Sequence, residues 1–269
     1  MQRHIMFSFS TIWRFDENSK TEYFIPFWNQ NIFNFEIIEN QNISNSILNN
    51  PLKVSDVCMK QDSKLASLSA ESKQEQLEAL KQVTLAAEKA MQWHAPFLIL
   101  RPGVVFPTTL EEPSNEDKQT RQSNLYDALE RYCRNIYTLA KKFPELTFCI
   151  LPAHSWQEFP YASELDYIFS DLSHLKLAYW HNTASAHLLE KLGINEQEQW
   201  LEEYGNKLVG IHWEDVVGKE NLYPIGIGEI NIEKIRSHLP KNIIEVLRIN
   251  SRFDELAVQF AKKYLENEI

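Results

Sequence analysis

The sequence has few glycines and cysteines for its length, and it has no long apolar run. Seven glycines and three cysteines are spread over 269 residues. No stretch approaches the roughly 18 apolar residues of a membrane-spanning helix, and the first residues lack the apolar core and cleavage site of a signal peptide. We therefore expect a cytoplasmic protein that has no membrane partner.

The three cysteines are Cys58, Cys133 and Cys149, and their spacing matches neither a zinc site nor a redox pair. Cys133 lies in a helix-like segment and Cys149 in an apolar run. Buried thiols in a reducing compartment are the expected outcome.

Basic side chains are also scarce, with 27 lysines and arginines against 37 aspartates and glutamates and a net charge of −10. Such a chain has no general attraction for phosphate backbones, so a nucleic-acid partner is not expected. The hydrophobic fraction of 43% supports a large core. Since no linker rich in glycine, proline or serine divides the chain, we expect a single domain over residues 1–269.

Short apolar runs alternate with amphipathic segments along the chain. Eight runs are predicted to be strands: 5–12, 32–38, 52–59, 97–100, 146–151, 175–180, 208–211 and 242–249. Helices are predicted at 70–93, 119–142, 164–172, 185–192, 196–204, 232–238 and 254–266. This alternation favours a parallel sheet, and eight repeats predict a closed (β/α)8 TIM barrel.

The two longest predicted helices each carry one apolar face. Ser69 is the predicted N-cap of the first, whose face consists of Leu77, Leu80, Val83, Ala87 and Met91. The face of the second consists of Leu125, Leu129, Cys133, Ile136, Leu139 and Ala140.

Polar residues gather where the predicted strands end, which is where ligands bind in barrels of this kind. His212 and Asp215 follow the seventh strand and are predicted to be catalytic, together with Glu36 near the end of the second. In an alternative interpretation, Asp215 holds the next loop by accepting backbone N–H groups, and Glu214 points to solvent.

Three histidines follow the ends of strands five, six and seven: His154, His181 and His212. Because neighbouring strand ends of a barrel are close in space, these residues predict a three-imidazole zinc or iron site. The alternative is a polar pocket in which the imidazoles hydrogen-bond to neighbouring side chains.

Other side chains at the strand ends are candidate ligand contacts. Arg101, Arg248 and Lys219 are predicted to hold a carboxylate or phosphate together. Alternatively, the arginines form salt bridges, for Arg248 with Glu36 or Glu245. Further predicted substrate-binding residues are Glu229, which follows Gly226-Ile227-Gly228, and the aromatic residues Trp180 and Trp213.

Several of these segments resemble the xylose isomerase-like TIM-barrel superfamily of sugar isomerases and epimerases, to which endonuclease-IV-type repair enzymes are distantly related. IHWED (211–215) followed by GIGEI (226–230) is similar to the family's H-x-x-D strand end and G-x-G-E loop. Arg101-Pro102-Gly103 is similar to its fourth-strand turn, and YWHNTASA (179–186) to its W-D-T-G-H-A segment. The resemblance implies proton transfer next to a carbonyl of a small polyhydroxy compound.

Members of this superfamily usually hold a divalent metal such as Zn²⁺, Mn²⁺ or Mg²⁺ with two glutamates, an aspartate and a histidine from strands five to eight. The resemblance aligns the three carboxylate positions with Pro152, His181 and Arg248, and the histidine with His212. The metal site is thus degenerate, and the cofactor stays an open question.

Two hypotheses follow from the degenerate metal site. The chain is either a divergent isomerase or epimerase for a carbohydrate-like ligand, or an inactive barrel that binds a ligand, a protein partner or a second copy of itself. A nuclease would need a metal cluster and a basic groove, and the sequence indicates neither.

Overall fold

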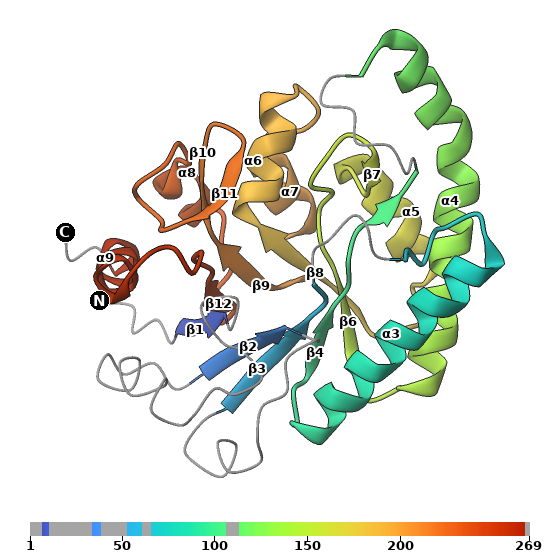
Figure 1. Cartoon of the computed structure of the whole chain (residues 1–269), viewed down its shortest axis with the longest axis horizontal. Helices are drawn as coiled ribbons and strands as arrows, with labels where there is room; N and C mark the ends of the chain where they lie inside the picture. Colours follow the sequence, from blue (N-terminus) through green and yellow to red (C-terminus); the bar gives the residue numbers. More distant parts are fainter. Residues whose placement is uncertain (1–6, 11–33, 39–52, 61–65, 106–112, 267–269) are drawn as a thin grey trace.

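The computed structural model describes residues 7–10, 34–38, 53–60, 66–105 and 113–266. Eight parallel strands form a closed barrel in the order β1-β12-β9-β8-β6-β4-β3-β2, which confirms the predicted TIM barrel (Figure 1). The barrel strands are β1 (Phe7–Ser10), β2 (Asn34–Ile38), β3 (Lys53–Cys58), β4 (Phe97–Ile99), β6 (Thr147–Ile150), β8 (Leu177–Asn182), β9 (Leu208–Trp213) and β12 (Ile244–Leu247). Parts of the predicted strands 5–12, 32–38 and 52–59 lie outside the described residues.

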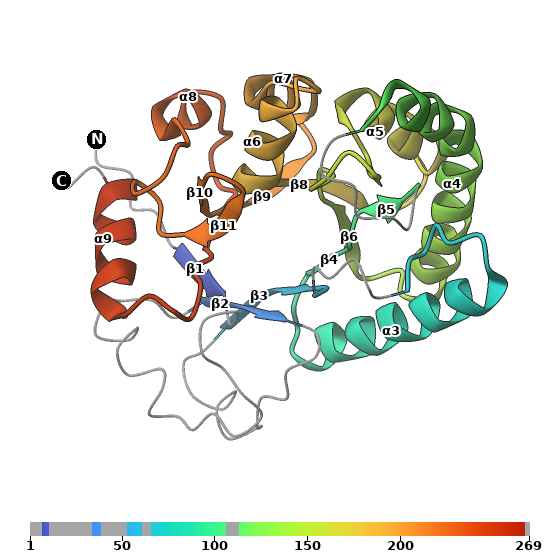
Figure 2. The same cartoon turned by 45° about the horizontal axis from the view of Figure 1, so that its top comes forward.

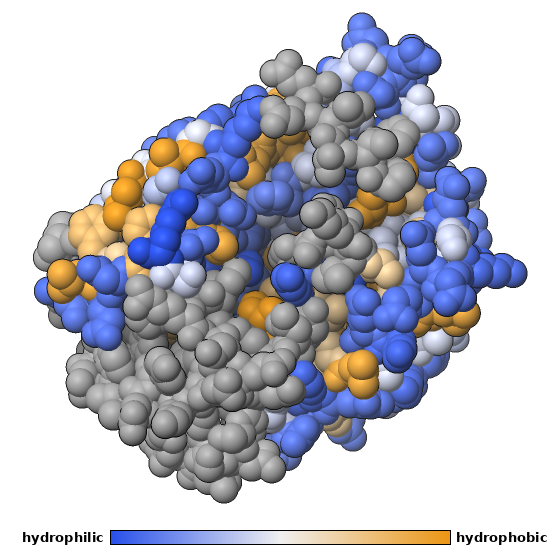
Figure 3. Space-filling model, viewed as in Figure 1, coloured by the Kyte–Doolittle hydropathy of each residue, from blue (hydrophilic) through white to orange (hydrophobic). Residues whose placement is uncertain are grey.

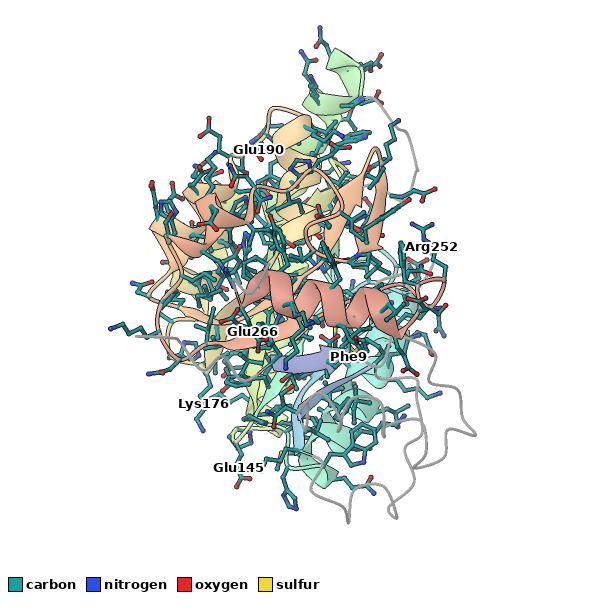
Figure 4. The ribbon with its side chains drawn as sticks, turned by 90° about the vertical axis from the view of Figure 1, so that its left-hand side faces the viewer. Phe9, Glu145, Lys176, Glu190, Arg252 and Glu266 are labelled. Atoms are coloured by element: carbon teal, nitrogen blue, oxygen red, sulfur yellow. The ribbon has the colours of Figure 1, made fainter. Side chains whose placement is uncertain are left out.

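Helices surround the barrel on the outside (Figure 2). Those described are α3 (Lys73–Gln92), α4 (Asn115–Lys142), α5 (Ala162–Asp171), α6 (Thr183–Lys191), α7 (Gln197–Tyr204), α8 (Ile232–Arg236) and α9 (Glu255–Leu265). Figure 4 shows α9 lying alongside β1, where Phe9 belongs to the outer core. Among the described helices, none is both long and apolar enough to cross a membrane.

Strand alternation separates two hydrophobic layers. On β8, Tyr179 points outward and stacks on Trp200 of α7, with 6.2 Å between ring centroids. Trp180, the next residue, points into the barrel. The interior layer consists of Ile38, Cys58, Ile99, Cys149, Leu151, Ala178, Trp180 and Val246.

The predicted start of the first long helix is wrong, and of its predicted apolar face only Val83 and Ala87 are buried. Ser72 is the N-cap of α3, because the Ser69 hydroxyl instead accepts from Val104 N and donates to Val104 O. Leu77 is 62% exposed and Met91 37% exposed. The buried face consists of Ala79, Val83, Ala86, Ala87 and Ala90. A stripe of small side chains allows the helix backbone to approach the barrel closely, which a leucine stripe would prevent.

The predicted face of the second long helix is confirmed, since all six of its residues are buried on α4. The helix starts four residues earlier than expected, at Asn115, because Ser114 and Asp117 form a capping box. The three cysteines are buried, as predicted. Burial raises the pKa of the Cys133 thiol to about 12 and that of Cys149 well above its ordinary value.

Two small antiparallel sheets extend the barrel beyond the strand ends, and the sequence patterns did not indicate either. β5 (Gly103–Val104) pairs with β7 (Glu158–Phe159), and β10 (Asp215–Val217) pairs with β11 (Glu220–Tyr223). β5 follows β4 and β10 follows β9, so both sheets stand at the end of the barrel where ligands bind in this fold.

Candidate active site

Five polar side chains meet inside the barrel at the ends of four strands. Glu36 lies on β2, Asn182 on β8, His212 and Glu214 on and after β9, and Arg248 directly after β12. We call these five residues the mouth cluster. None is more than 4% exposed. Strand register places them at one level, because His212 pairs with Asn182 on one side and with Val246 on the other.

Arg248 lies between two carboxylates of the mouth cluster. Its Nε is 3.4 Å from Glu36 Oε1, and its Nη1 is 3.5 Å from Glu214 Oε1. Glu36 Oε2 also forms a hydrogen bond with His212 Nε2, and Asn182 Nδ2 donates to Glu214 Oε1. All five members are thus joined in one network.

The neighbours of His212 determine which of its ring nitrogens carries the proton. Nδ1 faces two donors, Arg248 Nη1 at 3.3 Å and Asn182 Nδ2 at 3.5 Å. The Asn182 amide is oriented by Ser185 N, which donates to its Oδ1 at 2.8 Å. Because arginine has no acceptor, Nδ1 must accept and Nε2 must carry the proton that is donated to Glu36.

Burial and charge set the protonation of the site. Burial lowers the pKa of His212 and, with the charge of Arg248, outweighs the opposing effect of Glu36, which favours the neutral imidazole. For Glu36, burial would raise the pKa, but His212 and Arg248 outweigh burial and lower it to about 2. The neighbouring Asp56 has a pKa well above its ordinary value because of burial and the charge of Glu36.

Some buried atoms of the mouth cluster have no hydrogen-bond partner within the described part of the chain. They are Glu36 Oε1, Glu214 Oε2 and Arg248 Nε. Two acceptors and one donor therefore lie beside one another without a hydrogen bond, and of these Glu36 Oε1 and Arg248 Nε attract each other as an ion pair at 3.4 Å. Figure 3 shows the surface hollowed near the centre of this view, with both hydrophilic and hydrophobic residues beside the hollow.

Comparison with known proteins identifies the fold but no closer relationship. No protein-family model matches the sequence, and no curated protein matches it. The structure is similar to 3-keto-D-glucoside 4-epimerase from E. coli (14% identity, TM-score 0.71, covering 98% of this chain and 99% of that one). It is also similar to a D-tagatose 3-epimerase-like protein (15% identity, TM-score 0.70, with 98% and 99% covered). A third similar structure is D-psicose 3-epimerase from Clostridium cellulolyticum (12% identity, TM-score 0.67, with 97% and 99% covered). The chain shares the (β/α)8 TIM-barrel fold of these structures. At these identities the similarity establishes the fold alone.

A divalent metal does not fit the residues that this barrel presents on strands five to eight. The inward residues at those strand ends are Leu151, Asn182, His212 and Arg248. Two of them differ by one position from the residues that the sequence resemblance aligned: Leu151 stands in place of Pro152, and Asn182 in place of His181. Leucine offers no ligand atom and Arg248 carries a fixed positive charge, while both nitrogens of His212 are engaged within the network.

The structure does not bring the three candidate histidines together. His181 points outward from β8, with its ring nitrogens 2.7 Å from Tyr179 Oη and 3.3 Å from Gln197 Oε1. Burial lowers its pKa to about 4. His154 is exposed, and its Nδ1 lies 3.2 Å from Ser185 Oγ. Only His212 of the three belongs to the mouth cluster.

Asp215 holds a loop, as in the alternative interpretation of the sequence. Its carboxylate accepts from four backbone N–H groups at 2.9–3.1 Å: those of Val216, Gly226, Gly228 and Ile230. Gly226 has a φ of +91°, and a Cβ at Gly228 would overlap Val216 O and the Asp215 carboxylate. The two glycines therefore serve the close approach of this loop to Asp215.

Other predicted ligand contacts point away from the mouth cluster. Glu229 accepts from Lys191 Nζ at 2.8 Å and from Gly218 N at 2.7 Å on the outer surface. Arg101 donates to Ala66 O and Gln82 Oε1, both at 2.9 Å. Trp213 points outward, and its Nε1 donates to Glu245 Oε2 at 2.8 Å.

Trp180, by contrast, adjoins the mouth cluster from the barrel interior. Its ring centroid is 5.3 Å from that of His212, and it fills the space next to Gly210, where a Cβ would overlap the indole. Trp180 thus forms the floor beneath the cluster. Because the indole is fully buried there, it supports His212 from below.

The sequence patterns did not single out Asn182, Asp56 or Cys58 for the site. A signal for all three is nevertheless present as period-two alternation. Trp180 and Asn182 share one face of β8, and Asp56 and Cys58 share one face of β3. If every second residue of each strand is assigned to the barrel interior, these residues point inward and His181 points outward.

Proposed function

We propose that this barrel binds a small polyhydroxy carbonyl compound at the mouth cluster and acts on it as an isomerase or epimerase. The observation that carries the proposal is the meeting of a carboxylate, a neutral imidazole and a guanidinium at the ends of β2, β9 and β12. Buried titratable groups with shifted pKa values, gathered at this end of a barrel, are typical of active sites. The similar structures named above are sugar epimerases, which supports a carbohydrate-like ligand.

The unpartnered atoms of the site indicate what kind of ligand complements it. Glu214 Oε2 can accept from a hydroxyl group. Glu36 Oε1 and Arg248 Nε contact each other only as an ion pair at 3.4 Å, so that Oε1 can also accept from a hydroxyl group and Nε can donate to a carbonyl oxygen. Glu36 and Glu214 already neutralise the charge of the Arg248 guanidinium, and Arg101 is hydrogen-bonded elsewhere. An anionic ligand would therefore gain little electrostatic attraction at the mouth cluster. We therefore favour an uncharged sugar over the phosphate or carboxylate that the arginines suggested in the sequence.

The proposed reaction moves one proton. The Glu36 carboxylate removes a proton from the carbon next to the carbonyl, and the electron pair moves to the carbonyl oxygen, where Arg248 stabilises the negative charge. Return of the proton from Glu36 to the neighbouring carbon, with the hydroxyl proton transferred to the former carbonyl oxygen, gives an isomer. An epimer forms when a water molecule protonates the same carbon on the other face and Glu36 releases its proton to solvent. His212 orients Glu36 through their hydrogen bond.

Binding without turnover is the second candidate function. It is favoured by the pKa of Glu36 at about 2, because a carboxylate stabilised to this extent is a weak base for a carbon-bound proton. A barrel of this kind would recognise a sugar through the same atoms without changing it.

Ligand titration and solvent-exchange measurements test both candidates. Thermal shift and calorimetry would compare neutral ketoses and aldoses with the corresponding sugar phosphates and sugar acids. NMR in D2O would then detect deuterium at the carbon next to the carbonyl. Binding with exchange that disappears in Glu36→Gln, and persists in the surface control Glu229→Gln, supports an enzyme.

Binding without exchange supports the second candidate. If no neutral sugar binds, or if only the anionic compounds bind, the proposal is wrong.

A further inference from the structure

The guanidinium of Arg248 lies among side chains that would otherwise suit a metal ion. Within the ranges that the structure describes, ligand atoms of Glu36, Cys58 and His212 all lie within 4.8 Å of one another. All three residues are buried. Arg248 contacts two of them, at 3.4 Å from Glu36 Oε1 and 3.3 Å from His212 Nδ1.

We propose that Arg248 supplies the positive charge of the mouth cluster and thereby prevents zinc from binding to Glu36, Cys58 and His212. We call these three residues the latent zinc site. Thiolate, imidazole and carboxylate donors are the usual zinc ligands. These three come from β3, β9 and β2, so they are not the set that the resemblance implied for strands five to eight. The proposal rests on the proposed function in taking the mouth as the ligand site.

Arg248 opposes a metal ion through its charge. A guanidinium is always protonated, and a divalent cation bound by Glu36 and His212 would lie next to it in a buried, weakly screened environment. Glu36 and Glu214 already have Arg248 as their counter-ion. Without Arg248, two buried carboxylates would be left with no fixed positive partner in the described cluster.

Arg248 also opposes a metal ion through the tautomer of His212. Zinc binding at Nε2 requires the ring proton to move to Nδ1, since a ligating nitrogen offers its lone pair. In the native site, Nδ1 faces the N–H groups of Arg248, so a proton there would meet another donor. Replacing Arg248 removes the nearer of the two donors at Nδ1 and leaves Asn182 Nδ2, at 3.5 Å, as the weaker obstacle to a proton there. Nε2, which lies on the side of Glu36, can then offer its lone pair to the metal ion.

Metal titration of the native protein and of Arg248→Met tests this inference. Methionine retains much of the side-chain length without the charge. Both proteins are stripped with a chelator, dialysed against Zn²⁺ and analysed for bound metal and thermal unfolding, with no sugar present. We expect no bound zinc in the native protein and one equivalent in Arg248→Met. At a Zn²⁺ concentration about 100 times Kd, the variant's Tm should rise by roughly 5–10 °C.

Matched variants locate the bound ion. Arg248→Met/Cys58→Ser and Arg248→Met/His212→Ala should each bind zinc at least ~10-fold more weakly than Arg248→Met. Arg248→Lys, which keeps a positive charge, should bind none. An Arg248→Met variant that folds only when Zn²⁺ is present also supports the proposal.

Two results would overturn the inference. One is stoichiometric zinc in the native protein that is lost in His212→Ala. The other is the absence of zinc binding in Arg248→Met or, if that variant does not fold under either condition, in Arg248→Gln. Because the titration contains no sugar, its outcome is independent of whether the proposed sugar binding is found.

Discussion

Substitution of Asp215 tests whether its carboxylate holds the loop after β9 in place through hydrogen bonds. It is completely buried and accepts four backbone N–H groups, which brings Gly226, Gly228 and Ile230 against β10. Asp215→Ala would leave these donors without their acceptor. Each buried unsatisfied group costs about 1–3 kcal/mol, but a relaxed loop admits water to some of them. We expect a total loss of roughly 3–5 kcal/mol.

Urea unfolding at neutral pH measures this loss directly. Asp215→Asn should lie between the native protein and Asp215→Ala, because the amide keeps one acceptor but turns an N–H group towards backbone donors. Glu229→Ala is the matched control on the same loop. Since Glu229 pairs with Lys191 at the exposed surface, this substitution should lower the free energy of unfolding by no more than about 1 kcal/mol. A loss below about 1 kcal/mol in Asp215→Ala would refute the structural role and return Asp215 to the list of catalytic candidates.

Three further predictions concern the barrel interior and its outer layer. Asp56→Asn should raise the free energy of unfolding at pH 7, measured in urea. Because the pKa of Asp56 is raised in the folded protein, the stabilising contribution of its protonated form is complete below about pH 3.8 and is lost as pH rises, and asparagine does not ionise. His181 has its pKa lowered to about 4, so its contribution is complete above pH 6.5 and is lost as pH falls towards 4. The stability difference between the native protein and His181→Phe should therefore shrink by up to ~3 kcal/mol over that interval. Gly210→Ala should lower stability by about 1–3 kcal/mol in thermal or urea unfolding, because its methyl group would overlap Trp180.

The order of strands and helices was predictable from local patterns alone. Apolar runs of four to eight residues between amphipathic segments identified all eight barrel strands, and the heptad-like spacing on α4 identified its buried face. His212 was also placed correctly at a strand end. These features are local because the periodicity of a strand or helix is written in consecutive residues.

Which side chains of each strand point into the barrel could be determined only from the tertiary structure. His181 and Asn182 are adjacent, and a shift of one residue exchanges the side chain that enters the barrel. Similarly, α3 carries both a leucine stripe and an alanine stripe, and the close approach of the barrel selects the alanines.

The chemistry of the site was beyond local patterns for the same reason. Sequence patterns indicated Glu36, His212 and Arg248 separately and allowed Arg248 to pair with Glu36 or with Glu245. Closure of the barrel decides between them, because it places Arg248 against Glu36, whereas Glu245 faces outward to Trp213. Glu36 and His212 are 176 residues apart, and their hydrogen bond exists only because β1 and β12 join β2 to β9 around the closed sheet.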